Sequence, residues 1–226
     1  MLAGCAAGGV VAGPLLDRLA ARMTTRPAGP EIPGTALSVP VPVPATPVLA
    51  AVATGALLAL VALRLGGVPQ LAAYCVLFAG LVAVSIVDLR VGLVPRRVLY
   101  PTLAATAAGL LAASAADGDT IRLAWAAIGG VAAFVVFTAV WWLFPRGMGF
   151  GDVRMAGVCG MALGWLGFEQ LYVGFLAAFV LGLVFGLGNL AVRHTTRFPF
   201  APALAAGTAV GVLWGGYLGG LWLHPG

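Results

Sequence analysis

Residues 122–144 read RLAWAAIGGVAAFVVFTAVWWLF. The only charged side chain in this stretch belongs to Arg122, at its first position. A helix needs about 20 predominantly apolar residues to cross a lipid bilayer. We therefore predict a transmembrane helix over these residues.

Similar apolar stretches, separated by charged or turn-forming residues, recur along the whole chain of 226 residues. They predict helices over residues 2–20, 47–64, 69–89, 98–116, 122–144, 152–168, 170–192 and 202–223. The sequence thus predicts an all-α integral membrane protein, a polytopic bundle of about eight transmembrane helices in a single domain over residues 1–226. The first and sixth stretches contain charges or many glycines, so either helix could be tilted or broken where other protein covers its backbone.

The composition excludes a water-soluble globule, because 62% of the residues are hydrophobic and only 8% are charged. That leaves too little polar surface to cover a chain of this length in water. The sequence pI of about 9.7 raises the question of nucleic acid binding. No basic stripe with interleaved aromatic residues occurs on an amphipathic segment, so we expect a lipid bilayer and no nucleic acid as partner.

The arginines predict the orientation, since positively charged short loops stay on the cytoplasmic side of a membrane. With the N-terminus outside, ten of the 12 basic residues, all arginines, fall at cytoplasmic ends or loops, and only Arg64 and Arg122 face outward. We therefore predict that both termini lie outside. Residues 24–46 are rich in proline and predict an extended cytoplasmic linker.

The three cysteines, Cys5, Cys75 and Cys159, stand far apart in apolar surroundings. None belongs to a Cys-x-x-Cys pair or has a nearby histidine to complete a metal site. We therefore expect no metal and no cofactor.

Only seven residues are acidic, so each can be considered in turn. Asp17 and Glu31 belong to the first cytoplasmic region. Asp117, Asp119 and Glu169 fall in predicted outer loops, where carboxylates are simply hydrated. Two aspartates remain as candidates for chemistry.

These two are Asp88, in SIVDLRVGLVP, and Asp152, in GMGFGDVRMAG, both predicted at cytoplasmic ends of helices. An ionisable residue at the edge of lipid is costly and suggests function when a partner can be named. Two carboxyl groups within hydrogen-bond reach hold one proton between them, so that one activates water while the other polarises a carbonyl group. The pattern favours an aspartyl hydrolase, although the sequence does not fix the distance between the two side chains.

Each aspartate also has a structural interpretation. Asp88 could pair with Arg90 or Arg96, and Asp152 could cap the N-terminus of its helix. Three glycines in the turn before Asp152 favour a functional role, because a glycine-rich turn allows close backbone approach and unusual dihedral angles.

The two aspartate segments resemble the catalytic regions of type IV prepilin peptidases, a family of GxGD aspartyl membrane peptidases. Gly149, Gly151 and Asp152 match the GxGD motif, whose aspartate is catalytic in the family. Asp88 and Pro95 match the other catalytic stretch, an aspartate at a helix end followed seven residues later by proline. The resemblance implies that Asp88 and Asp152 form the catalytic pair.

Two further segments extend the resemblance. Residues 197–207, RFPFAPALAAG, are similar to the family's Pro-Phe-x-Pro segment that opens its last helix, here with Pro199 and Pro202. Residues 9–19, GVVAGPLLDRL, show a looser likeness to the family's first helix.

The resemblance implies a bacterial inner-membrane endopeptidase with its active site near the cytoplasmic face. Its substrates would be pilin-like precursors with a short basic leader and a hydrophobic helix, as in type IV pilus and type II secretion systems. Many family members carry two Cys-x-x-Cys pairs after the first helix, linked to zinc binding and methylation. Residues 24–46 contain no cysteine, so we expect a short form that is chiefly or only a peptidase, and methyltransferase activity is doubtful. Asp88, Asp152 and Glu31 would attract the basic leader.

Two alternative functions remain open at this stage. Presenilin and signal peptide peptidase share GxGD, and Pro202, Ala203 and Leu204 spell their third motif, but Val87 stands before Asp88 where they have tyrosine. A small proton- or cation-coupled transporter would also use membrane carboxylates, although near the midplane and usually within inverted repeats.

Overall fold

A computed structural model describes residues 47–65, 69–144, 148–193 and 199–223, and every regular element in these ranges is a helix. The helices are α2 (Pro47–Leu65), α3 (Leu71–Val91), α4 (Arg96–Asp117), α5 (Thr120–Leu143), α6 (Phe150–Leu166), α7 (Phe168–Arg193) and α8 (Ala201–Leu223). Each falls within two residues of a predicted helix at both ends, which confirms seven predicted helices. The helix predicted over 2–20 and the linker predicted over 24–46 lie outside the described residues.

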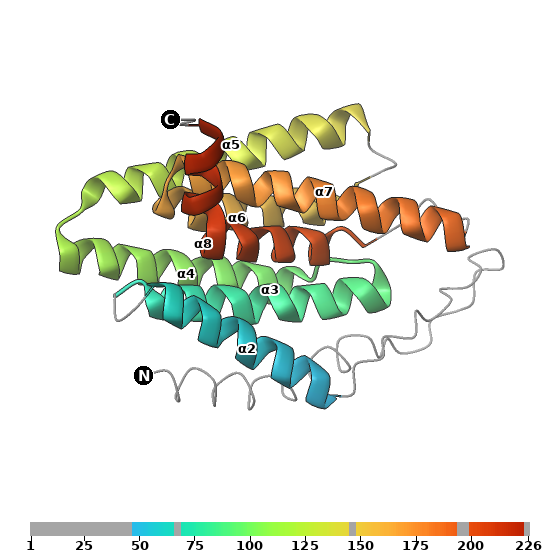
Figure 1. Cartoon of the computed structure of the whole chain (residues 1–226), viewed down its shortest axis with the longest axis horizontal. Coiled ribbons are helices and arrows are strands. Elements are labelled where there is room, and N and C mark those ends of the chain that lie inside the picture. Colours follow the sequence, from blue (N-terminus) through green and yellow to red (C-terminus); the bar gives the residue numbers. More distant parts are fainter. Residues whose placement is uncertain (1–46, 66–68, 145–147, 194–198, 224–226) are drawn as a thin grey trace.

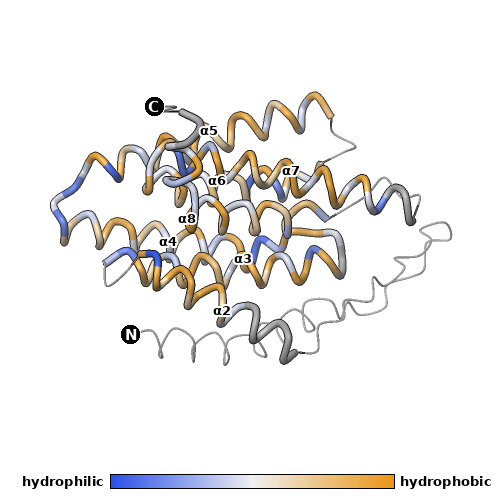
Figure 2. Tube along the Cα trace, viewed as in Figure 1, coloured by the Kyte–Doolittle hydropathy of each residue, from blue (hydrophilic) through white to orange (hydrophobic). Residues whose placement is uncertain are grey.

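Five of the described helices are long and apolar enough to cross a membrane, namely α3, α4, α5, α7 and α8. The tube in Figure 2 is hydrophobic along most of the helices, whereas the loop between α4 and α5 is hydrophilic. α6 has 17 residues and lies largely inside the bundle, as the presence of four glycines in it allows. The sixth predicted helix is thus a continuous helix, too short to count among the candidate spans.

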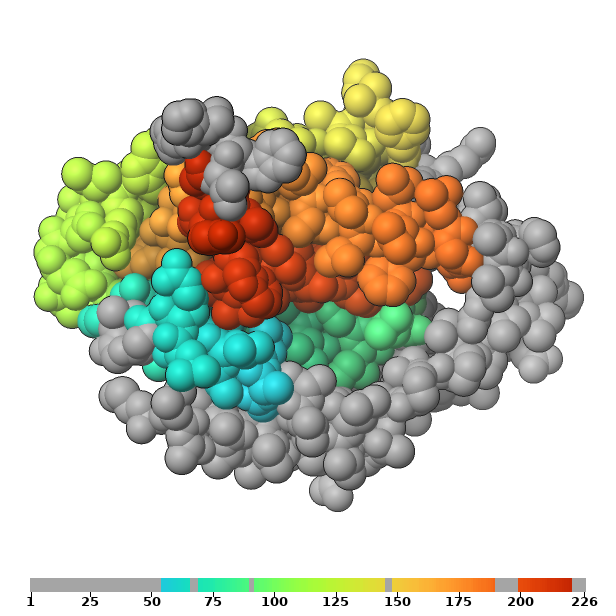
Figure 3. Space-filling model, viewed as in Figure 1, coloured from blue at the N-terminus to red at the C-terminus, as the bar shows by residue number. Residues whose placement is uncertain are grey.

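The helices run roughly along one direction in Figure 1, with α3 beside α4 and α7 beside α8. The α4–α5 loop lies at one end of the bundle, while the α3–α4 loop and the start of α8 lie toward the other. The face shown in Figure 3 is formed largely by α2, α7 and α8, with α3 visible between them. The end of α3 and the start of α8, from the two halves of the chain, lie at the same end of the bundle.

Glycines allow the closest helix pairs to form. A Cβ atom added at Gly207 of α8 would stand 2.5 Å from the Cβ of Ala178 on α7, and one at Gly129 of α5 would stand 2.5 Å from the carbonyl oxygen of Gly160 on α6. In lipid, such close packing replaces the hydrophobic force that drives helices together in water.

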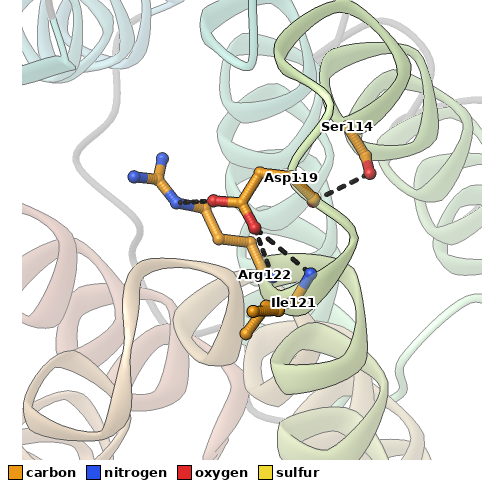
Figure 4. A network of polar contacts seen from close by, with 4 residues as sticks. All are labelled: Ser114, Asp119, Ile121 and Arg122. Atoms are coloured by element: carbon orange, nitrogen blue, oxygen red, sulfur yellow. Dashed lines mark hydrogen bonds and ion pairs between the residues drawn. The ribbon is translucent and has the colours of Figure 1, made fainter.

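The α4–α5 turn shows a set of polar contacts at the opposite end from Asp88 (Figure 4). Asp119 accepts hydrogen bonds from the backbone N–H groups of Ile121 and Arg122, and its carboxylate also pairs with the Arg122 side chain at 3.0 Å. The hydroxyl of Ser114 donates to the Asp119 carbonyl oxygen. Asp119 is therefore the N-cap of α5, and the expectation that it is simply hydrated was wrong, because the first turn of a helix offers unpaired N–H groups.

Candidate active site

Asp88 lies in the last turn of α3, and its side chain is 5% exposed. The backbone N–H of Gly92 donates to the Asp88 carbonyl oxygen, and Gly92 has a φ of 66°, a left-handed conformation that glycine adopts without strain. The sequence therefore ends α3 one turn after the carboxylate and leaves the side chain at the rim of the bundle.

The start of α8 holds the Asp88 carboxylate. The backbone N–H of Ala201, the first residue of α8, donates a hydrogen bond of 3.1 Å to Oδ2 of Asp88. A helix N-terminus has unpaired N–H groups and favours a negative charge. Pro199 and Pro202 flank this donor, so the predicted Pro-Phe-x-Pro segment lies directly beside the predicted catalytic residue.

An aromatic cluster fixes the chain just before Ala201. The buried ring of Phe200 packs against Phe137 of α5, with centroids 6.3 Å apart, and against Phe179 of α7 at 6.2 Å. Phe137 and Phe179 stack on each other at 5.4 Å. Rings from α5 and α7 thus hold Phe200, the residue directly before the Ala201 N–H.

Asp152 is the third residue of α6, and its side chain is 8% exposed. Its Oδ2 accepts a hydrogen bond of 3.3 Å from the backbone N–H of Gly149. The helix-capping interpretation of Asp152 is therefore correct for one oxygen. Its Oδ1 is buried and, among the described residues, has no hydrogen-bond partner. A buried unpaired carboxylate oxygen is costly, and it is available to a water molecule or a substrate group.

The two segments that carry the aspartates pack against each other. Gly151, beside Asp152, packs against Val94 in the loop after α3, so closely that a Cβ atom at Gly151 would stand 2.7 Å from the Val94 Cβ. The first turn of α6 is thereby held against the loop that follows Asp88.

The motif glycines differ in what they do. The close approach expected of a glycine-rich turn is present at Gly151, but a Cβ atom at Gly149 would meet only ordinary contacts, 3.5 Å away at the nearest. Gly149 has a φ of −78°, and the described glycines with positive φ are Gly92, Gly118 and Gly167. The expectation of unusual dihedral angles in this turn was therefore wrong for the glycines that the structure describes.

Pro95 caps the start of α4. No described hydrogen bond joins it to Asp88 or Asp152. It is the N-cap of α4, and its carbonyl oxygen accepts from the N–H groups of Val98 and Leu99. Because proline lacks a backbone N–H and has a fixed φ, it both ends the loop and starts the next helix. Its role is to set the length of the loop against which Gly151 packs.

The alternative that Asp88 pairs with Arg96 is wrong, because these two described residues form no ion pair. The side chain of Arg90 lies outside the described residues, as does Glu31. Within the ranges that the structure covers, no three His, Cys, Asp or Glu side chains converge on a possible metal site. The expectation of no metal and no cofactor stays a prediction.

Sequence reasoning missed the contributions of Ala201, Phe200 and Val94. Ala201 acts through its backbone, and no side-chain pattern reports a backbone donor. The signal that could have found it is the proline-rich start of a helix, since such a start leaves N–H groups free for an anion.

The family profile described as the type IV leader peptidase family matches residues 75–187. This match covers half of the chain and includes both aspartates. The chain belongs to the type IV leader peptidase family.

Individual members of the family are similar to this chain in sequence. A prepilin leader peptidase/N-methyltransferase from Aeromonas salmonicida is 32% identical over 143 residues, which are 60% of this chain and 46% of the relative. Proteins with the same name from Stutzerimonas stutzeri and Pseudomonas aeruginosa are 32% and 31% identical over 175 residues, 74% of this chain and 58% of each relative. The chain thus spans about half the length of these relatives. No solved structure matches it significantly.

Proposed function

We propose that this leader peptidase family member is a membrane aspartyl endopeptidase that uses Asp88 and Asp152 as its catalytic pair. The observation that supports the proposal is a pair of buried carboxyl groups on two segments that match the family's catalytic motifs and that pack together through Gly151 and Val94. Burying two acidic side chains inside an apolar bundle costs free energy, and such a cost is typical of a functional site.

The first chemical step adds water to the scissile peptide bond. The ionised aspartate takes a proton from a water molecule, and the resulting hydroxyl oxygen bonds to the carbonyl carbon. The protonated aspartate gives its proton to the carbonyl oxygen, so the tetrahedral intermediate carries no net charge. One proton has then moved onto the first carboxyl group and one has left the second.

The second step breaks the carbon–nitrogen bond. The carboxyl group that took the water proton donates it to the leaving nitrogen, and the other carboxylate recovers a proton from a hydroxyl group of the intermediate as the new carboxylic acid forms. The pair returns to its singly protonated state. The buried oxygen Oδ1 of Asp152 and the carboxylate of Asp88, held by Ala201, supply the positions for these transfers.

The substrate that this chemistry suits is a pilin-like precursor with a short basic leader followed by a hydrophobic helix. The relatives are named as prepilin leader peptidases, and the two aspartates belong to the last turn of α3 and the first turn of α6 rather than to mid-helix. A site at a bundle end suits a bond at the junction of leader and helix. We place this end at the cytoplasmic face of the bacterial inner membrane, from the distribution of arginines.

The alternatives fit the chain less well. Presenilin-like proteolysis would cut within a membrane helix, whereas the aspartates here lie at the ends of α3 and α6. A transporter would place its carboxylates along a pathway through the bundle. Methylation of the new N-terminus is not part of the proposal, because the relatives extend well beyond the matched region.

The decisive experiment co-expresses a pilin precursor with the wild-type chain and with Asp88→Asn, Asp152→Asn and Asp117→Asn. Asp117 is the matched control, since it is an exposed aspartate at the opposite end of the bundle. Cleavage is followed by the mass of the pilin, which also reports the position of the cut, and membrane accumulation of each variant is measured alongside.

We expect the two site variants to lose at least about a thousandfold in rate, as removal of a catalytic proton carrier usually does, while Asp117→Asn cleaves like wild type. Comparable cleavage by either site variant would overturn the catalytic assignment. A cut within the hydrophobic helix would instead support the presenilin-like alternative.

A further inference from the structure

An apolar groove of about 430 Å³ lies between α4, α5 and α6. Small residues line part of it, namely Ala126, Ala127, Gly130 and Gly157, beside larger apolar side chains such as Leu103 and Phe134. Nearby positions on α5, including Ile128 and Val131, are more than half exposed. On helices that cross a membrane, this exposed apolar surface faces lipid, so the groove opens toward the bilayer.

One charged residue, Arg154, lines the groove. Its guanidinium carbon lies 4.5 Å from the centroid of the Phe150 ring, a cation–π contact. Phe150 in turn packs against Trp141 at 5.1 Å and against Phe134 at 6.4 Å. The cation is thus held at the groove by aromatic packing.

The charge of Arg154 is not neutralised by any carboxylate in the part of the chain that the structure describes. Arg96 and Arg97, both exposed, start α4 less than one turn before the groove residues Leu99 and Tyr100. The contact of Gly151 with Val94 brings this start of α4 to the start of α6. Three arginines therefore lie near one end of the groove. At a lipid boundary, an arginine without a carboxylate partner is stabilised by binding an anion.

The volume decides which kind of occupant fits. At roughly 30 Å³ for a group the size of a water molecule, 430 Å³ holds about fourteen methylene groups, close to one acyl chain. A transmembrane helix is about 10–12 Å wide over its whole length and is too large to enter. The basic leader of the proposed substrate is also disfavoured, because its charge has the same sign as Arg154.

We propose that this groove binds a phospholipid with an anionic headgroup, its chain against the small residues of α5 and α6 and its phosphate on Arg154. Residues two positions apart on a helix point about 200° apart, so Arg154 lies on the side of α6 away from Asp152. The lipid site is therefore separate from the catalytic pair and does not depend on the proposed function.

The test is native mass spectrometry of the full chain, purified in mild detergent, stripped of lipid and titrated with three probes. Dioleoyl phosphatidylglycerol is the anionic lipid, dioleoyl phosphatidylcholine has the same chains without net charge, and glycerol phosphate supplies a phosphate without chains. We expect one phosphatidylglycerol per chain, bound at least about fivefold more tightly than phosphatidylcholine, and no retained glycerol phosphate.

Two variants address the two halves of the site, each with a matched control. Arg154→Gln is expected to weaken phosphatidylglycerol about tenfold, the loss of one charge-assisted hydrogen bond, whereas Arg122→Gln at the other end of the bundle binds like wild type. Ala127→Phe fills the groove and lowers binding of both lipids. Ala132→Phe changes an exposed alanine of α5 that does not line the groove and leaves binding unchanged.

Ala127 is exposed, so its replacement is compatible with folding, and equal helix content by circular dichroism is the check. Wild-type phosphatidylglycerol binding by Arg154→Gln or Ala127→Phe would overturn the proposal, as would equal affinity for the two lipids. Unchanged lipid binding by Ala127→Phe together with lost leader cleavage would likewise overturn the lipid site and show that the groove serves cleavage.

Discussion

The backbone N–H of Ala201 donates a hydrogen bond to the side chain of Asp88, although 113 positions separate the two residues. This contact ties the last turn of α3 to the first turn of α8. It also fixes the direction of the buried Asp88 carboxyl group. The Pro-Phe-Ala-Pro segment is therefore a positioning element for the candidate catalytic pair.

Replacing Ala201 by proline tests this relationship, because proline is favoured in the first turn of a helix but has no N–H, and its ring carbon takes the place of the hydrogen that points at Asp88. We expect cleavage of a pilin precursor to slow about tenfold or more, the loss of one hydrogen bond to a charged group. Ala201→Gly keeps the N–H and is expected to retain wild-type activity. Equal rates for the two variants, at equal membrane accumulation, would show that the hydrogen bond does not position Asp88.

The two glycines of the GxGD motif should respond differently to alanine. Gly151→Ala places a Cβ atom 2.7 Å from the Cβ of Val94, so either the loop after α3 or the start of α6 must move. Such overpacking costs about 1–3 kcal/mol and separates the two aspartates. Gly149→Ala meets only ordinary contacts and is expected to keep most of the activity.

A second-site change makes the Gly151 prediction specific. Val94→Gly removes the Cβ atom that clashes and leaves the Val94 backbone 3.6 Å away, so it should restore part of the activity lost by Gly151→Ala. The measurement is the cleavage rate of the single and double variants. Failure of the double variant to recover, with Gly149→Ala equally impaired, would indicate that both glycines act by another route.

The helices could be predicted because apolar stretches bounded by arginine, glycine or proline mark membrane spans. The two aspartates could be selected as candidates because charges inside such a chain are rare. The buried face of each helix could not be predicted from the sequence, because lipid is as apolar as the protein interior. Ile128 is 56% exposed and Leu77 is fully buried, although isoleucine and leucine are both strongly hydrophobic residues.

The contacts within the site could not be predicted from the sequence for a related reason. The Ala201 donor belongs to the backbone, and the packing of Gly151 on Val94 depends on how α3 and α6 meet. The GxGD motif suggested that both of its glycines are sterically required, but the structure shows this requirement only at Gly151. A motif gives residue types, whereas the reason for each residue comes from its neighbours.

The close packing of α7 and α8 predicts a contrast between two glycines of α8. Gly207→Ala would place a Cβ atom 2.5 Å from Ala178, and the two helices must separate by a corresponding distance. Gly220 has open space around its Cα, so Gly220→Ala is expected to be neutral or slightly stabilising. Thermal unfolding in detergent should show a lower midpoint for Gly207→Ala alone, and equal midpoints would contradict the packing.

Tyr74 joins α3 to α6 through a buried hydrogen bond, in which its hydroxyl donates to the carbonyl oxygen of Ala162. Tyr74→Phe keeps the ring and removes the donor, so we expect a loss of about 0.5–1.5 kcal/mol in the free energy of unfolding. Tyr100→Phe changes a tyrosine that is 47% exposed and should have no measurable effect. Unfolding titrations with sodium dodecyl sulfate compare the two variants. Because α3 carries Asp88 and α6 carries Asp152, a destabilised Tyr74→Phe should also lose cleavage activity at a lower temperature than Tyr100→Phe.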